Sequence, residues 1–347
     1  MAVSARDVAR VAGVSISTVS RALTKPENVA PETRDKVLAT ARGMGYSPNL
    51  AARGLIIGRT GLIGLIVPDL ENPFFASVVK GVQSRARDAG YAVIISDSDE
   101  DPSQEAELVR DLCKRVDGMV MCSPRAPDSV IAELARECTL VLVARRCGDV
   151  PAVEIDNLEG IRLAMVHLRA LGHRTIAYVG GPPLSWSNMQ RLDALRTVAT
   201  QYADTELINL GSFQPYVSGG VAAADLVIAS PATAVLAYND LVAYGLLDRL
   251  RQRGVRVPDD ISVVGVDNLP MSALTTPSLT SVGIPLVNCG RASIDVVLSL
   301  VQHPTSPPVH HHDLSFQLAV RKSTGVVNTT SESAASRQPF STVGRQL

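Results

Sequence analysis

Residues 5–24, ARDVARVAGVSISTVSRALT, are the stretch that decides the fold of the N-terminal part of this chain. Ser4 and Asp7 have the spacing of a capping box, with Asp in place of the usual Glu, so a helix is predicted over residues 5–12. Gly13 follows it, and glycine accepts the positive φ that a sharp turn requires. The apolar residues expected on the buried face, at i, i+3 and i+4 spacing, are Val8, Val11 and Ala12.

A second helix is predicted over residues 16–23, with Ser15 at its N-cap. Ala9 is small where the two helices must cross, and Val19 and Leu23 would be buried. The residues left on the outer face are Ile16, Ser17, Ser20 and Arg21. Two short helices joined in this way are typical of a helix-turn-helix, whose second helix enters the DNA major groove. The alternative is an ordinary pair of amphipathic helices.

A third helix is predicted to begin at Pro31, because proline suits the first helical position, and to end at the Gly43 and Gly45 pair. The residues expected to close a small core against the first two helices are Val37, Leu38 and Ala41.

Charge is distributed unevenly along the chain. Residues 1–60 contain nine Lys or Arg and four Asp or Glu, a net charge of +5, whereas the whole chain is −1 and residues 61–347 therefore have −6. A basic head that binds phosphates and an acidic body would show this asymmetry. Taken alone, the excess of positive charge would be explained better by a solvated charged face. Beside a helix-turn-helix, the excess supports binding to nucleic acid.

Several motifs extend the pattern. DVARVAGVSISTVSR at residues 7–21 is followed by YSPNLAARGL at 46–55 and PDLENPFF at 68–75. Ile63-Gly64-Leu65 and RKST at 321–324 continue it through nearly the whole chain. On these motifs the chain resembles the lactose-repressor (LacI/GalR) family of bacterial transcription regulators.

The resemblance implies a homodimer on a near-palindromic operator in double-stranded DNA, with one head on each half-site. Ile16, Ser17 and Arg21 match the base-contacting positions, and an Arg can donate to guanine O6 and N7 together. Leu55 matches the hinge leucine that enters the minor groove, and the alternative is that it packs between the hinge helices of the dimer. The complete set of expected DNA-contacting residues is Ser4, Ser15, Ile16, Ser17, Thr18, Ser20, Arg21, Tyr46, Asn49, Ala52 and Leu55.

The length of 347 residues suits a small head and a two-lobed body. We expect an all-α helix-turn-helix domain at 1–48, a hinge helix and linker at 49–60, an effector-binding and dimerisation body at 61–325 and a disordered tail at 326–347. Gly54 weakens the hinge helix, so the hinge should fold only when two hinges pair on DNA. The alternative is that Gly54 permits a close approach of the two hinge helices.

Short apolar runs alternate with helical patterns after residue 60, which indicates an α/β body of doubly wound parallel sheets. The predicted strands are 62–67, 92–96, 118–122, 140–143, 175–179, 234–237 and 262–266. The predicted helices are 77–89, 104–115, 161–171, 190–200 and 241–253. The family resemblance implies two similar lobes joined by three crossings, like a periplasmic sugar-binding protein, with the ligand in the cleft beyond the strand ends.

The resemblance and the predicted strand ends together indicate an effector site. Arg191, Asn239 and Asp267 match positions where the family holds its effector, and a guanidinium and a carboxylate suit polar hydroxyls or an anion. Asn239 and Asp240 could instead cap the next helix, and this is the role expected for Asp240. Trp186 could be a platform for a sugar ring or a packing residue. The complete set of expected effector residues is Phe74, Phe75, Trp186, Arg191, Phe213, Asn239 and Asp267.

Other features argue against a metal, a cofactor or secretion. The five cysteines include no C-x-x-C pair, which disfavours a zinc site and, in an intracellular chain, indicates reduced thiols. The run His310-His311-His312 would alternate between two faces of an extended segment. The N-terminal residues lack the apolar core of a signal peptide, and residues 62–67 are too few to span a bilayer, so we expect a cytoplasmic protein.

The favoured hypothesis is a ligand-responsive, sequence-specific transcription regulator, a repressor and not an enzyme. A small metabolite would control its affinity for DNA, with a sugar as the first choice and a purine base as the second. A solute-binding receptor or a metabolic enzyme of similar fold is the alternative. The basic head opposes the receptor, and the lack of a defensible catalytic constellation or of a G-x-G-x-x-G phosphate loop opposes the enzyme.

Overall fold

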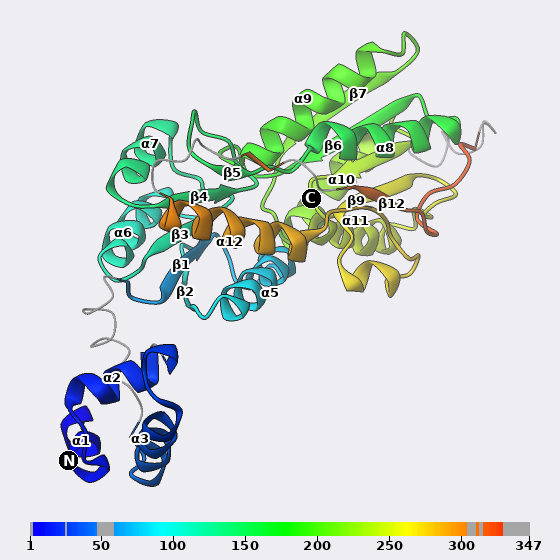
Figure 1. The fold of residues 1–347 in the computed structure, drawn as a ribbon. Helices are drawn as coiled ribbons and strands as arrows, with labels where there is room; N and C mark the ends of the chain where they lie inside the picture. Colours follow the sequence, from blue (N-terminus) through cyan, green and yellow to red (C-terminus); the bar gives the residue numbers. More distant parts are fainter. Residues whose placement is uncertain (1–2, 25, 47–58, 304–309, 312–314, 329–347) are drawn as a thin grey trace, which may run out of the picture. The chain divides into compact units, whose positions relative to one another are not determined.

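A computed structural model describes residues 3–24, 26–46, 59–303, 310–311 and 315–328. The chain forms two compact units that divide after Gly61, and each is described by itself (Figure 1). Several positions named in the sequence analysis lie outside the described residues. They are Asn49, Ala52, Gly54, Leu55, His312 and the expected tail after residue 328.

The first unit is the expected helix-turn-helix. It consists of α1 (Ala5–Ala12), α2 (Ile16–Thr24), a short 3-10 turn η1 (Pro26–Asn28) and α3 (Pro31–Gly43). Ser4 and Asp7 form the capping box, and Gly13 ends α1 with φ +67°. The buried core of this unit consists of Val8, Ala9, Ala12, Val19, Ala22, Val37 and Ala41.

Three residues of the expected core are not buried. Val11 is 59% exposed, because α2 and α3 pack on the side of α1 that holds Val8 and Ala9. Leu23 and Leu38 are only half-buried, and Ala22 occupies the core in α2. The choice of Val11 was wrong because an i, i+3, i+4 pattern does not say on which side of the stripe the neighbouring helices lie.

The second unit begins with a lobe whose sheet has the order β11-β5-β4-β3-β1-β2, with all its pairs parallel. Its strands are β1 (Leu62–Val67), β2 (Ala92–Asp97), β3 (Gly118–Cys122), β4 (Leu140–Val143), β5 (Ala152–Val153) and β11 (His310–His311). Its helices are α5 (Pro73–Asp88), α6 (Pro102–Cys113), α7 (Asp128–Glu137) and α12 (Leu286–Gln302). We call this lobe one.

Lobe two has a sheet of the order β12-β10-β9-β8-β6-β7, in which only the β10–β12 pair is antiparallel among the described strands. Its strands are β6 (Thr175–Gly180), β7 (Glu206–Ser212), β8 (Ala234–Ala237), β9 (Ser262–Asp267), β10 (Thr280–Gly283) and β12 (Gln317–Ala319). Its helices are α8 (Asn157–Ala170), α9 (Trp186–Thr200), α10 (Val217–Ala229), α11 (Asp240–Gln252) and the short η2 (Pro270–Ala273).

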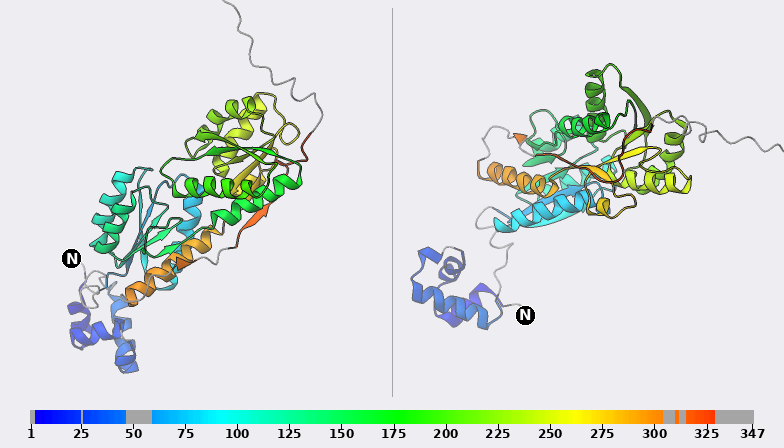
Figure 2. Two further views of the ribbon diagram at one scale, coloured as in Figure 1. Left: turned by 90° about the horizontal axis from the view of Figure 1, so that it is seen from above. Right: turned by 90° about the vertical axis from the view of Figure 1, so that its right-hand side faces the viewer.

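Both sheets are covered by helices on both faces, as Figures 1 and 2 show. Alternate residues of one strand enter different cores, because side chains of a strand point to opposite faces. Leu65 of β1 packs in the core with α5 and α12, whereas Ile66 packs with α6 and α7. In lobe two, Val264 and Val263 of β9 divide in the same way between α8 with α9 and α10 with α11. The doubly wound fold is therefore confirmed.

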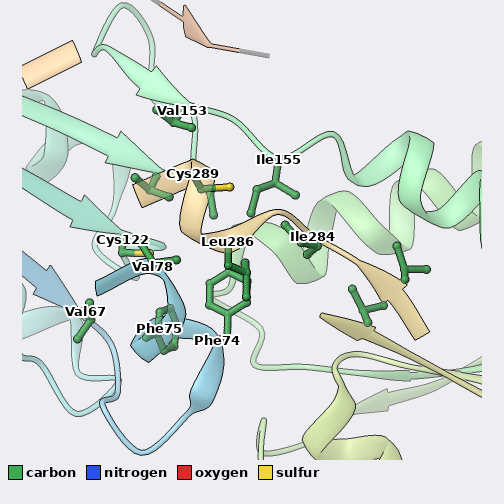
Figure 3. Packing of buried hydrophobic residues seen from close by; sticks show 14 of the residues in the cluster. Val67, Phe74, Phe75, Val78, Cys122, Val153, Ile155, Ile284, Leu286 and Cys289 are labelled. Atoms are coloured by element: carbon green, nitrogen blue, oxygen red, sulfur yellow. The ribbon is translucent and has the colours of Figure 1, made fainter. Parts of the chain in front are cut away.

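The chain passes between the lobes at three places. β5 leads into α8, β10 leads into α12, and β11 of lobe one precedes β12 of lobe two. Ile155 and Ile284 lie on the first two crossings and pack in one buried cluster with Phe74 and Leu286 (Figure 3). This cluster continues from the α5 and α12 face of lobe one to the α8 and α9 face of lobe two.

Each lobe contains one pair of helices that cross at glycines. A Cβ on Gly81 of α5 would lie 2.1 Å from the carbonyl oxygen of Val287 in α12. A Cβ on Gly220 of α10 would lie 1.9 Å from the carbonyl oxygen of Val242 in α11. The backbones approach so closely that only glycine fits at these two positions.

Several elements were not predicted from the sequence, among them α7, α10, α12, β7 and β10. The sequence of α10, VSGGVAAADLVIA, has two adjacent glycines and no polar stripe, so helical periodicity is not visible in it. Of the helices that the structure describes, none combines the length and the apolar character needed to cross a membrane.

Candidate functional site

A pocket lies between the two lobes of the second unit, at the carboxyl ends of its parallel strands. Lobe one contributes Asn72, Phe74, Phe75, Glu100, Ser123 and Arg125. Lobe two contributes Ser187, Arg191, Pro215, Tyr238, Asn239 and Asp267. Strand ends at the point where two lobes meet are the usual position for ligands in open α/β folds.

The backbone is unusual at these strand ends. Among the described residues, the non-glycine residues with positive φ are Asp99, Glu100, Ser123, Ala144, Asp267 and Asn268, with φ between 47° and 113°. Asp99 and Glu100 follow β2, Ser123 follows β3 and Ala144 follows β4, while Asp267 ends β9. Such backbone strain costs about 1–3 kcal/mol for each residue and is concentrated at functional sites. The six residues therefore mark the pocket edge as the functional edge of both sheets.

Arg191 is the central cation of the lobe-two wall. Its side chain is 4% exposed, and its guanidinium stacks over the Tyr238 ring with 5.0 Å between the central carbon and the ring centroid. Nε donates to Asn157 Oδ1 at 3.0 Å, and Nη1 donates to the Tyr238 carbonyl oxygen. Nη2 lies 3.9 Å from Asp267 Oδ1, an ion pair that is too long for a hydrogen bond.

Asp267 is a buried carboxylate without a full set of partners. Its side chain is 3% exposed, and no donor in the described part of the chain forms a hydrogen bond with it. Burial raises the pKa of Asp267 well above its usual value, although Arg191 opposes the shift. A buried carboxylate of this kind is costly unless a donor satisfies it. We therefore expect a ligand in the pocket to supply the donor.

Asn239 uses its amide within the protein. Its Oδ1 accepts a hydrogen bond from Val242 N at 2.9 Å and so caps α11, and its Nδ2 donates to the Pro215 carbonyl oxygen at 2.9 Å. This position joins α11 to the loop before α10, so a ligand at Asn239 would contact a side chain that is already held rigidly.

Asp240 does not cap α11, contrary to the expectation from the sequence, because Asn239 does. Its side chain is buried and accepts hydrogen bonds from Ser272 Oγ at 2.5 Å, Ser281 Oγ at 2.6 Å and Leu269 N at 2.7 Å. Burial outweighs these bonds and raises the pKa of Asp240 to about 6. Asp240 thus links the segment that follows β9 to strand β10.

The lobe-one wall is built around Arg125, which the sequence interpretation missed. Nε and Nη2 donate to the two carboxylate oxygens of Glu100 at 2.6 and 2.9 Å, and Nη1 donates to the Ser123 carbonyl oxygen at 2.7 Å. Buried Glu105 accepts hydrogen bonds from the backbone N–H groups of Arg125 and Ala126, which holds the loop in place. Arg125 closely follows strand 118–122, so the strand-end rule that selected Asp267 could have selected it.

The four expected aromatic residues do not lie together. Phe74 and Phe75 line the pocket in an edge-to-face pair, with 5.0 Å between ring centroids and 79° between planes. Trp186 and Phe213 are not among its lining residues. Trp186 packs against Arg145, and Phe213 lines a separate hollow of lobe two beside Pro182 and Pro183. Among the residues that the structure describes, no group of His, Cys, Asp and Glu side chains could hold a metal ion.

The described residues of the expected DNA face occupy α2 and its surroundings. Ser4 and Ser15 are exposed and cap α1 and α2, and Ser15 Oγ accepts a hydrogen bond from Thr18 N at 3.1 Å. Ile16 is 47% exposed, and Ser17 and Arg21 are exposed beside it. Thr18 and Ser20 are half-buried, as is Tyr46, which packs on the core of the unit. Arg21 Nε donates to the Ser17 carbonyl oxygen at 3.2 Å.

Comparisons with known proteins agree with this architecture. The model for bacterial regulatory proteins of the lacI family matches residues 4–49, and the model for periplasmic binding protein-like domains matches residues 165–324. The HTH-type transcriptional repressor CytR of Escherichia coli K12 is 33% identical over 311 residues, which cover 87% of this chain and 90% of CytR.

Two solved structures are similar over most of their length. The lac repressor dimer bound to operator and the anti-inducer ONPF has a TM-score of 0.83 at 28% identity, covering 94% of this chain and all of the repressor chain. A lacI-family transcriptional regulator of Enterococcus faecium with bound ribose has a TM-score of 0.68 at 29% identity, covering 77% of this chain and all of that one. The chain belongs to the lacI family of bacterial transcription regulators.

Proposed function

We propose that this protein is a homodimeric repressor that binds a near-palindromic operator and releases or retains it according to a small polyhydroxylated metabolite, with a sugar as the first choice. It would act in the bacterial cytoplasm, on the nucleoid. The observation that supports the effector most strongly is the buried Asp267 carboxylate, which faces the pocket beside Arg191 and accepts no hydrogen bond from any residue that the structure describes.

The chemistry of the pocket favours a sugar. A hydroxyl donates to a carboxylate and accepts from a guanidinium, so a sugar could present one hydroxyl to Asp267 and a neighbouring hydroxyl to Arg191 from the pocket side. Polar side chains from both lobes line the pocket, among them Asn72, Ser123 and Asn239, and such groups suit the several hydroxyls of a sugar. The similar regulator with bound ribose supports the same class. A purine base is the second choice, because Phe74 and Phe75 supply aromatic edges and faces.

A ligand screen tests the effector. The full chain is heated with each member of a panel of monosaccharides that includes ribose, and of purine bases that includes adenine, and the best stabiliser is titrated by calorimetry. Asp267→Asn should weaken the best sugar by about 100-fold, since one charge-assisted hydrogen bond is lost. Asp248→Asn on exposed α11 is the matched control and should bind normally. Stabilisation by no sugar, or unchanged affinity in Asp267→Asn, would overturn the assignment.

The exposed face of α2 supports the DNA-binding part of the proposal. Arg21 interacts only with Ser17 in the described structure, at an exposed site, so its guanidinium is free to turn toward a guanine. Ile16 can contact a thymine methyl group. Leu55, Asn49 and Ala52 are proposed hinge contacts from the family resemblance, with Leu55 as a minor-groove wedge.

Selection from a random duplex library yields the operator, and affinities are then measured at one fixed salt concentration. Arg21→Ala should cost about 1–3 kcal/mol on the selected site, mainly by relaxing one base position. Arg10→Ala is the control, because it removes an exposed arginine of the same unit from the first helix. An equal loss in both variants would show that Arg21 contributes charge only and does not read a base.

A further inference from the structure

Trp186 is the only tryptophan of the chain, and it does not line the pocket although Ser187 beside it does. It is half-buried, and its ring lies 5.7 Å from the guanidinium carbon of Arg145. Trp186 is the first residue of α9 in lobe two, whereas Arg145 follows β4 in lobe one. The two side chains therefore form a contact between the lobes.

The Arg145 side chain is held rigidly on the lobe-one side. It is 7% exposed, Nη1 donates to the Pro124 carbonyl oxygen at 2.9 Å, and Nη2 donates to Asp128 Oδ1 at 2.7 Å. The preceding residue, Ala144, has φ +58°, a conformation that turns the chain sharply at the end of β4. Arg145 is therefore placed by the lobe-one framework and not by Trp186.

One part of the Arg145 cation has no polar partner. Nε is buried and has no hydrogen-bond acceptor among the described residues. An aromatic face stabilises a cation within about 6 Å of its centroid, and more strongly where water is excluded. The Trp186 ring thus partly compensates the burial of Arg145, and this compensation exists only while lobe two stays against lobe one.

The lobe-two end of the contact is joined directly to the pocket. Trp186 begins the same helix that contains Ser187 and Arg191, both of which line the pocket. Ser185 caps this helix, and its Oγ lies 2.9 Å from the hydroxyl of Tyr238, whose ring packs under Arg191. Any movement that separates the lobes at Trp186 would also move Arg191 away from lobe one.

We propose that Arg145 and Trp186 are positioning residues that hold the lobes together beside the effector pocket without touching the effector. The proposal goes beyond the effector site and does not depend on which ligand fills it. Loss of the contact should raise the population of separated lobes by about 3- to 30-fold, the range that corresponds to a partly desolvated cation–aromatic contact.

Amide hydrogen exchange on the full unliganded chain tests this. In Arg145→Met, we expect faster exchange in pocket-edge segments remote from the substitution, residues 69–75 of lobe one and 212–216 and 267–269 of lobe two. Trp186→Leu should show the same pattern, whereas Trp186→Phe should retain part of the protection. The matched control is Arg146→Met, because Arg146 is the neighbouring arginine, is 58% exposed and does not stack on the ring.

Acrylamide quenching gives a second readout. Trp186 is the only tryptophan, so its emission reports this contact alone, and quenching should increase in Arg145→Met but not in Arg146→Met. Faster exchange confined to residues 123–128, 144–150 and 184–188 would show a local packing role and overturn the proposal. If Arg145→Met does not fold, the Trp186 variants decide by the same pattern. Failure of the ligand screen would leave this ligand-free result unaffected.

Discussion

The two walls of the pocket are built from the same architecture but differ in how their charges are satisfied. In lobe one, Arg125 donates to both oxygens of Glu100 and to the Ser123 carbonyl. In lobe two, Arg191 reaches Asp267 only at 3.9 Å, and the carboxylate has no hydrogen bond among the described residues. The lobe-one wall is thus preorganised, because its charged groups already have partners. In the lobe-two wall, a ligand must supply the hydrogen-bond donor for the Asp267 carboxylate.

The same contrast recurs within lobe two, at the ends of two adjacent strands. Asp240 follows β8 and accepts three hydrogen bonds, whereas Asp267 ends β9 and accepts none within the described residues. Both are buried, and burial raises the pKa of both. A buried carboxylate with three donors supports the fold, and one without donors is available for binding. Substitutions at these positions should therefore affect different properties.

The largest effect is expected from Asp240→Ala. It would leave the donors of Leu269, Ser272 and Ser281 buried without an acceptor, which should lower the free energy of unfolding by about 4 kcal/mol. Urea unfolding of the full chain measures this. Asp248→Ala on the exposed side of α11 should change it by less than about 0.5 kcal/mol. If Asp240→Ala and Asp248→Ala lowered the free energy of unfolding equally, the hydrogen bonds of Asp240 would not stabilise the fold.

The second effect is a pH dependence that arises from Asp240. Its pKa in the folded protein, about 6, lies above the ordinary value of 3.8, so the native state holds this proton more tightly than the unfolded state does. The stabilisation that results from this tighter proton binding is fully present below pH 4 and is lost as the pH rises through 6. The stability of the parent protein minus that of Asp240→Asn should fall by at most about 3 kcal/mol between pH 4 and 7. A flat difference would contradict the raised pKa.

The third effect is expected from Asp267→Asn, at the other buried carboxylate. Asp267→Asn should change the stability of the unliganded protein by less than about 1 kcal/mol, because no described residue donates a hydrogen bond to this carboxylate. Its cost should appear in ligand affinity, at about 100-fold. Thermal unfolding with and without the screened ligand separates the two. A large loss of stability without ligand would make Asp267 structural, like Asp240.

The smallest effect on ligand affinity is expected in lobe one. Arg125→Met should lower stability by about 2 kcal/mol, because Glu100 and the Ser123 carbonyl lose their donor at a partly solvated site. Its loss of ligand affinity should be smaller than that of Asp267→Asn. Arg136→Met, on the exposed face of α7, controls for loss of a charge. If Arg125→Met lost more ligand affinity than Asp267→Asn, Arg125 would bind the ligand directly.

Local patterns were sufficient for much of the fold. The capping box, Gly13 and the apolar spacing of residues 5–24 define the first two helices, because each depends on contacts within a few residues. The apolar runs of β1, β3, β4 and β8 match the predicted bounds, because strands that are buried on both faces are apolar throughout. Asn239 and Asp267 were placed at strand ends correctly, whereas Arg191 is the sixth residue of a helix that begins earlier than predicted, and the structure brings all three to one pocket.

The sequence by itself therefore determined the helix-turn-helix, the alternating α/β body, the family and most of the strand ends that form the pocket. Only the tertiary structure decided that Val11 faces solvent, that Asp240 is satisfied while Asp267 is not, and that Trp186 meets Arg145 from the opposite lobe. Local elements follow from neighbours three or four residues apart. The partners of a buried charge come from loops tens of residues away, and only the folded chain brings them together.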